Sequence, residues 1–123
     1  VAGIVSRNMG TIQNCYNTGN LINCIDSNGS YGGIAALSYG GTIENCYSTI
    51  TPNGVAGSAC RDIVASTDGN NISNVYCNGI VAGSASLTAT GTVSQANTDL
   101  PANYPSIWES GSGRPKLIGV PGQ

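Results

Sequence analysis

The stretch GTIQNCYNTG, residues 10–19, decides the fold because the chain carries nearly the same letters again at residues 41–49, GTIENCYST. A weaker third copy, NNISNVYCNG, occupies residues 70–79. Isoleucine, asparagine and tyrosine recur at equivalent places in the three copies, 31 and then 29 residues apart. The chain therefore contains a repeat of about 30 residues, and such a period governs any prediction of the fold.

Two further phrases follow the same period. AGIV at residues 2–5 returns as GGIA at residues 32–35, so each unit holds two short apolar pieces. ATGTVSQANT at residues 89–98 suggests a fourth, weaker unit in which Val93 takes the place of isoleucine. Units of about 30 residues thus account for almost the whole chain.

The composition favours short strands joined by tight turns. The 123 residues include 18 glycines, and only 8% of the residues are charged. Gly, Asn, Ser and Thr separate the apolar pieces, as they do in chains of brief strands. Apolar residues do not recur at helical spacing over three turns, so we expect no helix. A hydrophobic content of 40% with a net charge of -2 argues against disorder.

These features predict an all-β fold, namely a single-stranded parallel β-helix or β-solenoid of about four coils with a C-terminal cap. Neighbouring coils would pair in parallel about 4.8 Å apart, so that equivalent residues stack along the axis. We expect the solenoid repeats at residues 1–98 and the capping segment at residues 99–123. In that segment, closely spaced prolines disfavour a central strand, and Trp108 is expected to cover the end of the last coil.

Two stacks of side chains are the candidate structural sites of the repeat. The first is an internal aliphatic stack formed by Ile12, Ile43 and Ile72. The second is an amide ladder at a turn, formed by Asn14, Asn45 and Asn74. Each amide is expected to bond to the next coil, because a buried amide without a partner is costly. Gly3, Gly33 and Gly41 are expected at turns that need a positive φ or a close backbone approach.

The repeat units carry a family resemblance. AGIVSRNMGTIQNCYNTGNL at residues 2–21 and GGIAALSYGGTIENCYST at residues 32–49 resemble the GLUG repeat of bacterial surface proteins, in which G-G-[IL]-V-G precedes G-T-I-x-N-C-Y-S-T-G. Ser6 and Ala36 depart from that pattern where it has glycine. The resemblance implies a secreted or surface-attached bacterial protein of the adhesin type, or a module beside an immunoglobulin-cleaving metallopeptidase. It implies no catalytic residues.

The residues themselves argue against an enzyme, a metal site and a cofactor. The chain has no histidine, which removes Ser-His and Cys-His nucleophiles and the usual catalytic zinc sites. The acidic residues do not cluster along the chain, and they are Asp26, Glu44, Asp62, Asp68, Asp99 and Glu109. DSNGS at residues 26–30 and STDGNN at residues 66–71 faintly resemble calcium loops, but Asp, Asn and Gly favour ordinary turns for backbone reasons.

The five cysteines leave two alternatives open. Cys15 and Cys46 occupy the same repeat position, so their Cα atoms would lie within the range for a disulfide. Their Cα–Cβ bonds would be parallel, however, and Val75 fills the same position in the third unit. This favours free buried thiols in a small apolar slot. Cys24, Cys60 and Cys77 are irregularly placed, and the odd total leaves at least one thiol without an internal partner.

Neither nucleic acid nor a membrane is an expected partner. Only four residues are basic, too few for a phosphate-binding stripe. No apolar run reaches the length of a membrane span. The chain begins on a repeat phrase without Met or a signal peptide, so we interpret it as a piece of a longer protein. Its first coil would expose an unpaired edge, to be covered by upstream sequence of the precursor or by a self-associating copy.

The function hypothesis is a non-catalytic, extracellular or cell-surface structural and adhesive module of a larger bacterial protein, with a host or cell-surface ligand. An alternative is an ice- or glycan-binding solenoid that uses rows of threonines, motivated by Thr11 with Thr42 and Thr18 with Thr49. A second alternative is an accessory module of a secreted peptidase.

Overall fold

The computed structural model describes residues 2–19, 30–50, 59–68, 71–78 and 88–123. In chain order its elements are β1 (Val5–Asn8), β2 (Thr11–Gln13), β3 (Tyr16–Asn17), β4 (Ser30–Gly32), β5 (Ala35–Ser38), β6 (Thr42–Ser48), β7 (Ala59–Arg61), β8 (Val64–Thr67), β9 (Ile72–Tyr76), α1 (Val93–Asn103), β10 (Trp108–Glu109) and β11 (Lys116–Leu117).

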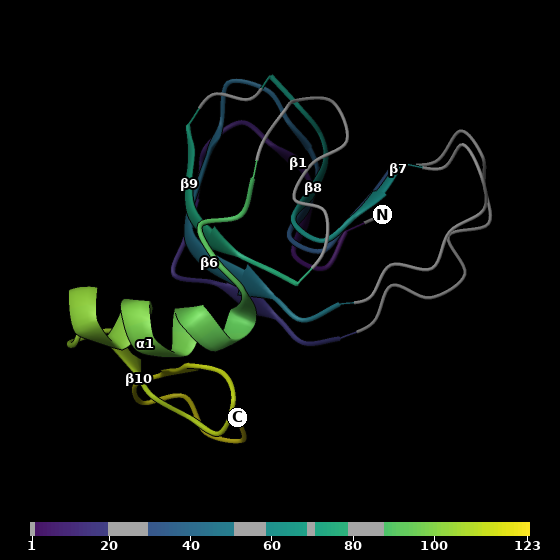
Figure 1. The fold of residues 1–123 in the computed structure, drawn as a ribbon. Coiled ribbons are helices and arrows are strands. Elements are labelled where there is room, and N and C mark those ends of the chain that lie inside the picture. Colours follow the sequence, from purple (N-terminus) through teal and green to yellow (C-terminus); the bar gives the residue numbers. More distant parts are fainter. Residues whose placement is uncertain (1, 20–29, 51–58, 69–70, 79–87) are drawn as a thin grey trace.

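Three of the sheets are parallel, and each joins strands from successive repeat units. The first has the order β1-β5-β8, the second has the order β2-β6-β3 with β9 also paired to β6, and the third pairs β4 with β7. Partner residues lie 29 to 31 positions apart, as in Ile12 with Ile43 and Val5 with Ala35. Figure 1 shows the strands of successive units lying over one another. The separation between paired residues therefore equals the length of the sequence repeat.

The main core lies between these parallel strands and is built from small and branched apolar side chains. Ile34, Ile43 and Ile63 are fully buried there, and Cys46 joins them at 0% exposure. Burying a branched aliphatic side chain stabilises the folded state by about 1.5–3 kcal/mol. Because each repeat unit contributes equivalent residues, the core extends from unit to unit.

The prediction of an all-β, single-stranded parallel β-helix is wrong. The described residues form four separate small sheets, one of which is the antiparallel pair β10-β11, together with helix α1. No closed solenoid is shown in the part of the chain that the structure describes. The physical reason is that the strands are short, only two to seven residues long. Stacking in register requires only that equivalent strands pair, and it does not require a continuous closed coil.

The fourth unit, expected at residues 89–98, is mostly helix. Its first residues pair with the end of β9, since Gly91 forms a parallel bridge with Tyr76, but these partners lie only 15 positions apart and do not keep the register of the repeat. Thr92 then acts as the N-cap of α1, and its side chain accepts a hydrogen bond from the backbone N–H of Gln95 at 3.3 Å. The helix crosses the boundary that we expected between the repeats and the cap at residues 98 and 99.

The expectation of no helix was wrong because the apolar spacing changes at this point. The buried residues of α1 are Val93, Ala96 and Leu100, at positions i, i+3 and i+7 of one helical face. In a strand, by contrast, buried residues alternate with exposed ones. With a cap at Thr92 and this spacing, the local sequence specifies a short helix even beside β-rich repeats.

The C-terminal segment covers a side of the parallel sheets rather than the end of a coil. Trp108 is 1% exposed and packs with Tyr47 of β6 and Tyr76 of β9. The ring centroids of Tyr47 and Trp108 lie 5.9 Å apart, and those of Tyr16 and Tyr47 are stacked 5.1 Å apart. Figure 1 shows α1 and β10 as a layer along one side of the stacked strands. The C-terminal layer therefore packs against a row of tyrosines from three repeat units.

A side-chain clasp ties helix α1 to the hairpin of β10 and β11. Asn97 Nδ2 donates to the carbonyl of Gly111 at 3.0 Å, and its Oδ1 accepts from the Gly111 N–H at 2.8 Å. Pro101 lies inside the helix and cannot donate a backbone hydrogen bond to the carbonyl of Asn97. Ser110 Oγ donates to that carbonyl instead, at 3.0 Å. The proline is thus accommodated because the hairpin supplies the missing donor.

Gly33 is required because two backbone segments approach closely at the start of a repeat unit. A Cβ atom at Gly33 would lie 1.9 Å from the carbonyl oxygen of Asp62, a distance that no real Cβ atom shows. Gly3, at the equivalent place in the first unit, would similarly meet the carbonyl oxygen of Gly33 at 2.2 Å. These glycines therefore serve close approach, and neither is among the residues with a positive φ.

Candidate functional site

The three asparagines of the predicted ladder share one unusual backbone conformation. Asn14, Asn45 and Asn74 have φ values of 55°, 54° and 49°, in the left-handed region. Asparagine enters this region more readily than other residues with a side chain. Each one lies between the isoleucine and the tyrosine of its unit, so the chain bends at the same point in each of the three copies.

Among the described residues, the amide ladder consists of one side-chain hydrogen bond between neighbouring units. Asn74 Nδ2 donates to Asn45 Oδ1 at 3.2 Å and also lies 3.5 Å from the hydroxyl of Tyr104. Asn14 Oδ1 is buried and has no hydrogen-bond partner among the described residues. Its backbone N–H donates to the carbonyl of Glu44 at 3.3 Å. The structure therefore brings Asn45 and Asn74 together through their side chains, while Asn14 joins its neighbour through the backbone.

The isoleucines of the predicted stack lie in register. Ile12 pairs with Ile43, and Ile43 pairs with Ile72. Ile43 is fully buried, Ile12 is 9% exposed, and Ile72 is partly buried against the same core. This stack contains no polar or nucleophilic atom, so its contribution is the burial of apolar area between units.

The bend at each asparagine determines which of the following side chains enter the main core and which face the C-terminal layer. In β6, Ile43 and Cys46 both point into the main core, although strict alternation would place them on opposite faces. Tyr47, the next residue, packs on the outside against Trp108. The left-handed Asn45 between them accounts for this change of phase.

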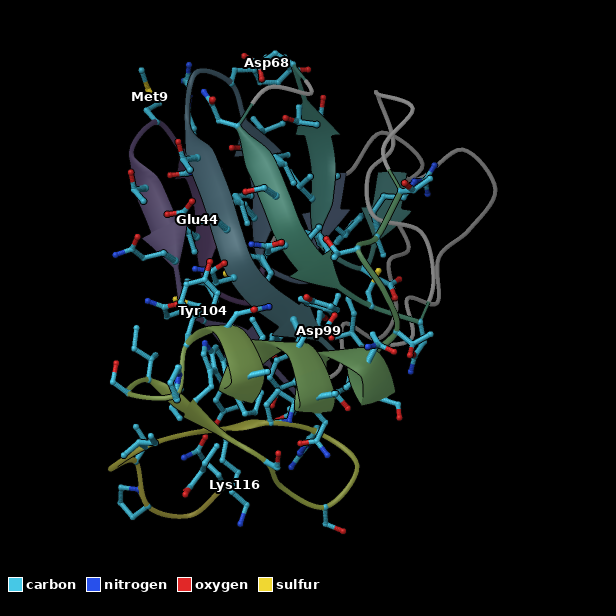
Figure 2. The ribbon with its side chains drawn as sticks, turned by 60° about the vertical axis from the view of Figure 1, so that its left-hand side comes forward. Met9, Glu44, Asp68, Asp99, Tyr104 and Lys116 are labelled. Atoms are coloured by element: carbon cyan, nitrogen blue, oxygen red, sulfur yellow. The ribbon has the colours of Figure 1, made fainter. Side chains whose placement is uncertain are left out.

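Outward-facing polar side chains of the second sheet form rows across three repeat units. Gln13 pairs with Glu44, and Glu44 pairs with Ser73, so these side chains lie side by side on one face. Gln13 and Ser73 are exposed and Glu44 is partly exposed. We call these three residues the polar row. Figure 2 shows Glu44 on the open face of this sheet, between Met9 and Tyr104.

A shorter row of threonines runs beside the polar row. Thr11 pairs with Thr42. The next unit carries Asn71 at this place, since the N–H of Ile43 donates to the Asn71 carbonyl at 2.9 Å. Thr18 and Thr49 lie beyond the bend, where the N–H of Thr49 donates to the carbonyl of Asn17. The threonine row on this face therefore has two members among the described residues.

Two of the acidic residues, Asp68 and Asp99, join a turn and the C-terminal layer to the rest of the fold. Asp68 Oδ2 accepts a hydrogen bond from the N–H of Gly40 at 3.0 Å, which joins the turns of two successive units. Asp99 accepts from the hydroxyl of Tyr76 at 3.2 Å, and burial followed by this carboxylate raises the pKa of Tyr76 to about 12. Across the described ranges no three Cys, Asp or Glu side chains are grouped to hold a metal ion. Residues 26–29 of the DSNGS stretch, Asp26 among them, lie outside those ranges.

Two thiols face one another where the first and second units meet. The pairing of Tyr16 with Tyr47 places the preceding residues, Cys15 and Cys46, opposite each other. Their side chains hydrogen-bond to each other, and both are free thiols. Each Sγ also lies 3.1 Å from the carbonyl oxygen two residues earlier, that of Gln13 or Glu44. The two sulfur atoms are therefore held by the same local geometry in both units.

The two thiols differ in acidity because only one receives the shared hydrogen bond. Donation from Cys46 lowers the pKa of the Cys15 thiol to about 7, against the opposing effect of burial. The same hydrogen bond and then burial raise the pKa of Cys46. Cys15 is partly exposed, whereas Cys46 is 0% exposed. The pair therefore combines an accessible, acidic thiol with a buried, protonated one.

Two features of this region escaped the sequence analysis. We expected positive φ values at glycines, whereas the structure has them at the repeated asparagines. An asparagine that recurs at one position of every unit is itself a signal for the left-handed conformation. The repeated tyrosines were aligned but given no role, and the buried spacing of residues 93, 96 and 100 could have identified the helix that covers them. Cys24 and the side chain of Cys60 lie outside the described residues, and Cys77 is buried.

In comparisons with known proteins, no family model, no curated protein and no solved structure matched this chain. The resemblance to the GLUG repeat therefore stays a prediction. Within the described ranges, no helix has the length and apolar character needed to cross a membrane.

Proposed function

We propose that this chain is a non-catalytic structural and adhesive repeat module of a cell-surface protein, and that it binds its partner through the polar row. The observation that carries the proposal is the register of β2, β6 and β9, which sets Gln13, Glu44 and Ser73 side by side on an open face. Amide, carboxylate and hydroxyl groups at regular spacing can make several hydrogen bonds to one extended polar ligand.

The rigidity of the support favours binding without a large entropic cost. The polar row stands on paired strands whose opposite face is anchored in the core by Ile43 and Ile12. Side chains on paired strands are held more firmly than side chains on loops, so less freedom is lost when a ligand binds. The resemblance to bacterial surface repeats supports an extracellular location for such a module.

The test is binding of the fluorescently labelled chain to fixed epithelial cells, with unlabelled chain as competitor. The row variant carries Gln13→Ala, Glu44→Ala and Ser73→Ala together, and the control carries Ser94→Ala, Thr98→Ala and Ser112→Ala at exposed positions of the C-terminal layer. We expect saturable binding that the row variant loses by roughly tenfold or more, as when several hydrogen bonds are removed. Equal binding by both variants, or no saturable binding by the parent chain, contradicts the proposal.

The threonine row supports a second candidate, binding of ice or of a glycan. Thr11 and Thr42 are paired neighbours on the same face, which is the arrangement that such a surface needs. The third member is Asn71, so the row is short. Thermal hysteresis of the parent chain, abolished by Thr11→Ala with Thr42→Ala, would favour this candidate. Absence of hysteresis would leave the adhesive module as the better proposal.

A further inference from the structure

The cysteine pair between the first two units has the arrangement of a reactive dithiol. Cys15 and Cys46 face one another across adjacent parallel strands, and their side chains are in hydrogen-bond contact. Cys46 is fully buried in the main core, while Cys15 lies at the edge of that core and is partly exposed. A reagent from solvent can therefore reach one sulfur atom and not the other.

We propose that Cys15 and Cys46 form a thiol–disulfide exchange site, in which Cys15 attacks an external disulfide and Cys46 then closes an internal bridge between the first two repeat units. The external oxidant is a small soluble disulfide such as glutathione disulfide. This activity is separate from the adhesive function proposed above and does not depend on it.

The reaction balances in two steps. In the first, the Cys15 thiolate attacks one sulfur atom of glutathione disulfide, whose S–S bond breaks and releases one glutathione as thiolate, which takes up a proton. In the second, Cys46 loses its proton and attacks the Cys15 sulfur of the mixed disulfide, whose S–S bond breaks and releases the second glutathione as thiolate, which takes up a proton. Two protein thiols are oxidised to one disulfide, and one glutathione disulfide is reduced to two thiols.

The protonation states of the pair suit these roles. At neutral pH a thiol with a pKa of about 7 is roughly half ionised, whereas an ordinary cysteine is ionised to only a few per cent. Cys15 is therefore the nucleophile. Once Cys15 is bonded to glutathione, its sulfur is no longer a thiolate that accepts the hydrogen bond from Cys46. The main cause that raises the pKa of Cys46 is then removed.

The geometry of parallel strands makes the resulting bridge a reversible one. Equivalent Cβ atoms on paired strands lie about 4.8 Å apart, slightly more than the roughly 3.5–4.5 Å that a disulfide prefers. The strands must therefore draw together by roughly 0.3 to 1.3 Å. A strained disulfide is more easily reduced than a relaxed one, so we expect the bridge to open again with mild reductants.

Val75 shows how to test the second step without disturbing the core. It pairs with Cys46 and occupies the equivalent position of β9, at 2% exposure, so valine fits this slot. The variant Cys46→Val keeps the packing and removes the resolving thiol. Cys77→Val, which replaces another buried cysteine of the same core, is the matched control.

The experiment treats each folded protein with glutathione disulfide at neutral pH and identifies the products by intact mass and peptide fragmentation. We expect the parent chain and Cys77→Val to lose two hydrogens and to yield a Cys15–Cys46 cross-link. We expect Cys46→Val to stop at a mixed disulfide between Cys15 and glutathione. A parent chain in which Cys15 is cross-linked to a cysteine other than Cys46, or in which Cys15 keeps a stable mixed disulfide with glutathione, overturns the proposal.

A measurement on the parent chain alone covers the case in which a variant does not fold. Brief alkylation of the native protein with iodoacetamide, followed by peptide mapping, reports which thiol reacts first. We expect Cys15 to be labelled about tenfold or more faster than Cys46, in line with its greater ionised fraction and exposure. Equal labelling of the two, or faster labelling of Cys46, overturns the assignment of roles.

Discussion

The side chain of Asn74 donates a hydrogen bond from Nδ2 to Oδ1 of Asn45 at 3.2 Å, and both residues have a positive φ. Asparagine thus meets two demands at the bends of the second and third units. Its backbone adopts the left-handed conformation, and its side chain satisfies the neighbouring unit. Either demand alone could be met by another residue, glycine for the first and serine for the second.

Substitution of Asn45 separates these two demands. Asn45→Gly keeps the left-handed backbone but removes the acceptor of the Asn74 amide, whereas Asn45→Ala loses both. We expect Asn45→Ala to lower the free energy of unfolding by about 2–4 kcal/mol, the sum of an unsatisfied amide and left-handed strain. Asn45→Gly is expected to cost about 1 kcal/mol less than Asn45→Ala. Urea denaturation followed by circular dichroism measures both, and equal midpoints would contradict the role assigned to φ.

Trp108 is the centre of the contact between the C-terminal layer and the tyrosine row. It is 1% exposed, and its Nε1 is buried without a hydrogen-bond partner among the described residues. Trp108→Ala is expected to destabilise the fold by about 3–5 kcal/mol through lost packing. Trp108→Phe should cost less than half as much, because it keeps a ring against Tyr47 and removes the unpartnered N–H. The comparison of the two urea midpoints tests this, and a Phe variant as unstable as the Ala variant would speak against it.

The clasp formed by Asn97 is expected to hold the hairpin onto helix α1. Asn97→Ala removes two hydrogen bonds to the backbone of Gly111 and leaves partly buried groups without partners. We expect a loss of about 1–3 kcal/mol in the free energy of unfolding. Asn103→Ala, at the exposed end of the same helix, is the control and should change stability by less than about 0.5 kcal/mol. Matching losses from the two variants would mean that the clasp has no stabilising role.

The buried tyrosines make the fold sensitive to alkaline pH. Burial raises the pKa of Tyr47 to about 12, against the charge of Arg114, and burial together with Asp99 raises that of Tyr76 to about 12. An unfolded tyrosine ionises near pH 10. Below that pH the stabilisation by the neutral phenols is fully present, and it is lost as the pH rises from about 10 to about 12. We expect urea midpoints to fall over this range, and a smaller fall in Tyr76→Phe. A midpoint independent of pH in this window would refute the burial argument.

The sequence repeat predicts the register in which strands pair, but it does not predict whether the strands form a closed coil. Ile12, Ile43 and Ile72 pair as the alignment of the units placed them, because equivalent residues of a repeat prefer equivalent neighbours. Whether strands join into a continuous coil depends on how the chain bends between them. An asparagine can be present because the backbone is left-handed at that residue or because its side chain makes a hydrogen bond, and the sequence alone does not distinguish these two cases. The expected closed β-helix therefore went beyond what the period supports.

The helix and the dithiol show what a local pattern can and cannot give. The spacing of Val93, Ala96 and Leu100 is helical and could have been read from the sequence. The face that this helix covers could not, because it depends on which side of the strands the tyrosines reach after the bend. Likewise, the alignment placed Cys15 opposite Cys46, but the difference in their burial arises only from their positions at the edge and the interior of the core.

The last prediction concerns the open edge of the second sheet. Among the described strands, β2 pairs only with β6, so one side of β2 has no neighbour. The carbonyl of Gly10 accepts from the N–H of Thr42, and the N–H of Asn14 donates to the carbonyl of Glu44. Because alternate residues of a parallel strand bond to opposite sides, the N–H of Gln13 points to the open side. An unpaired edge of this kind promotes association between chains.

Gln13→Pro removes that outward donor and leaves the bonds to β6 intact, as proline is tolerated on the free side of an edge strand. We expect light scattering of the parent chain to rise with concentration as chains associate through this edge, and we expect the variant to scatter as a smaller species at every concentration. The urea midpoint of the variant at low concentration is the control, since an unchanged midpoint shows that the fold itself is intact. A parent chain that stays monomeric at millimolar concentration, or a folded variant that associates equally well, would show that β2 is not the edge through which chains meet.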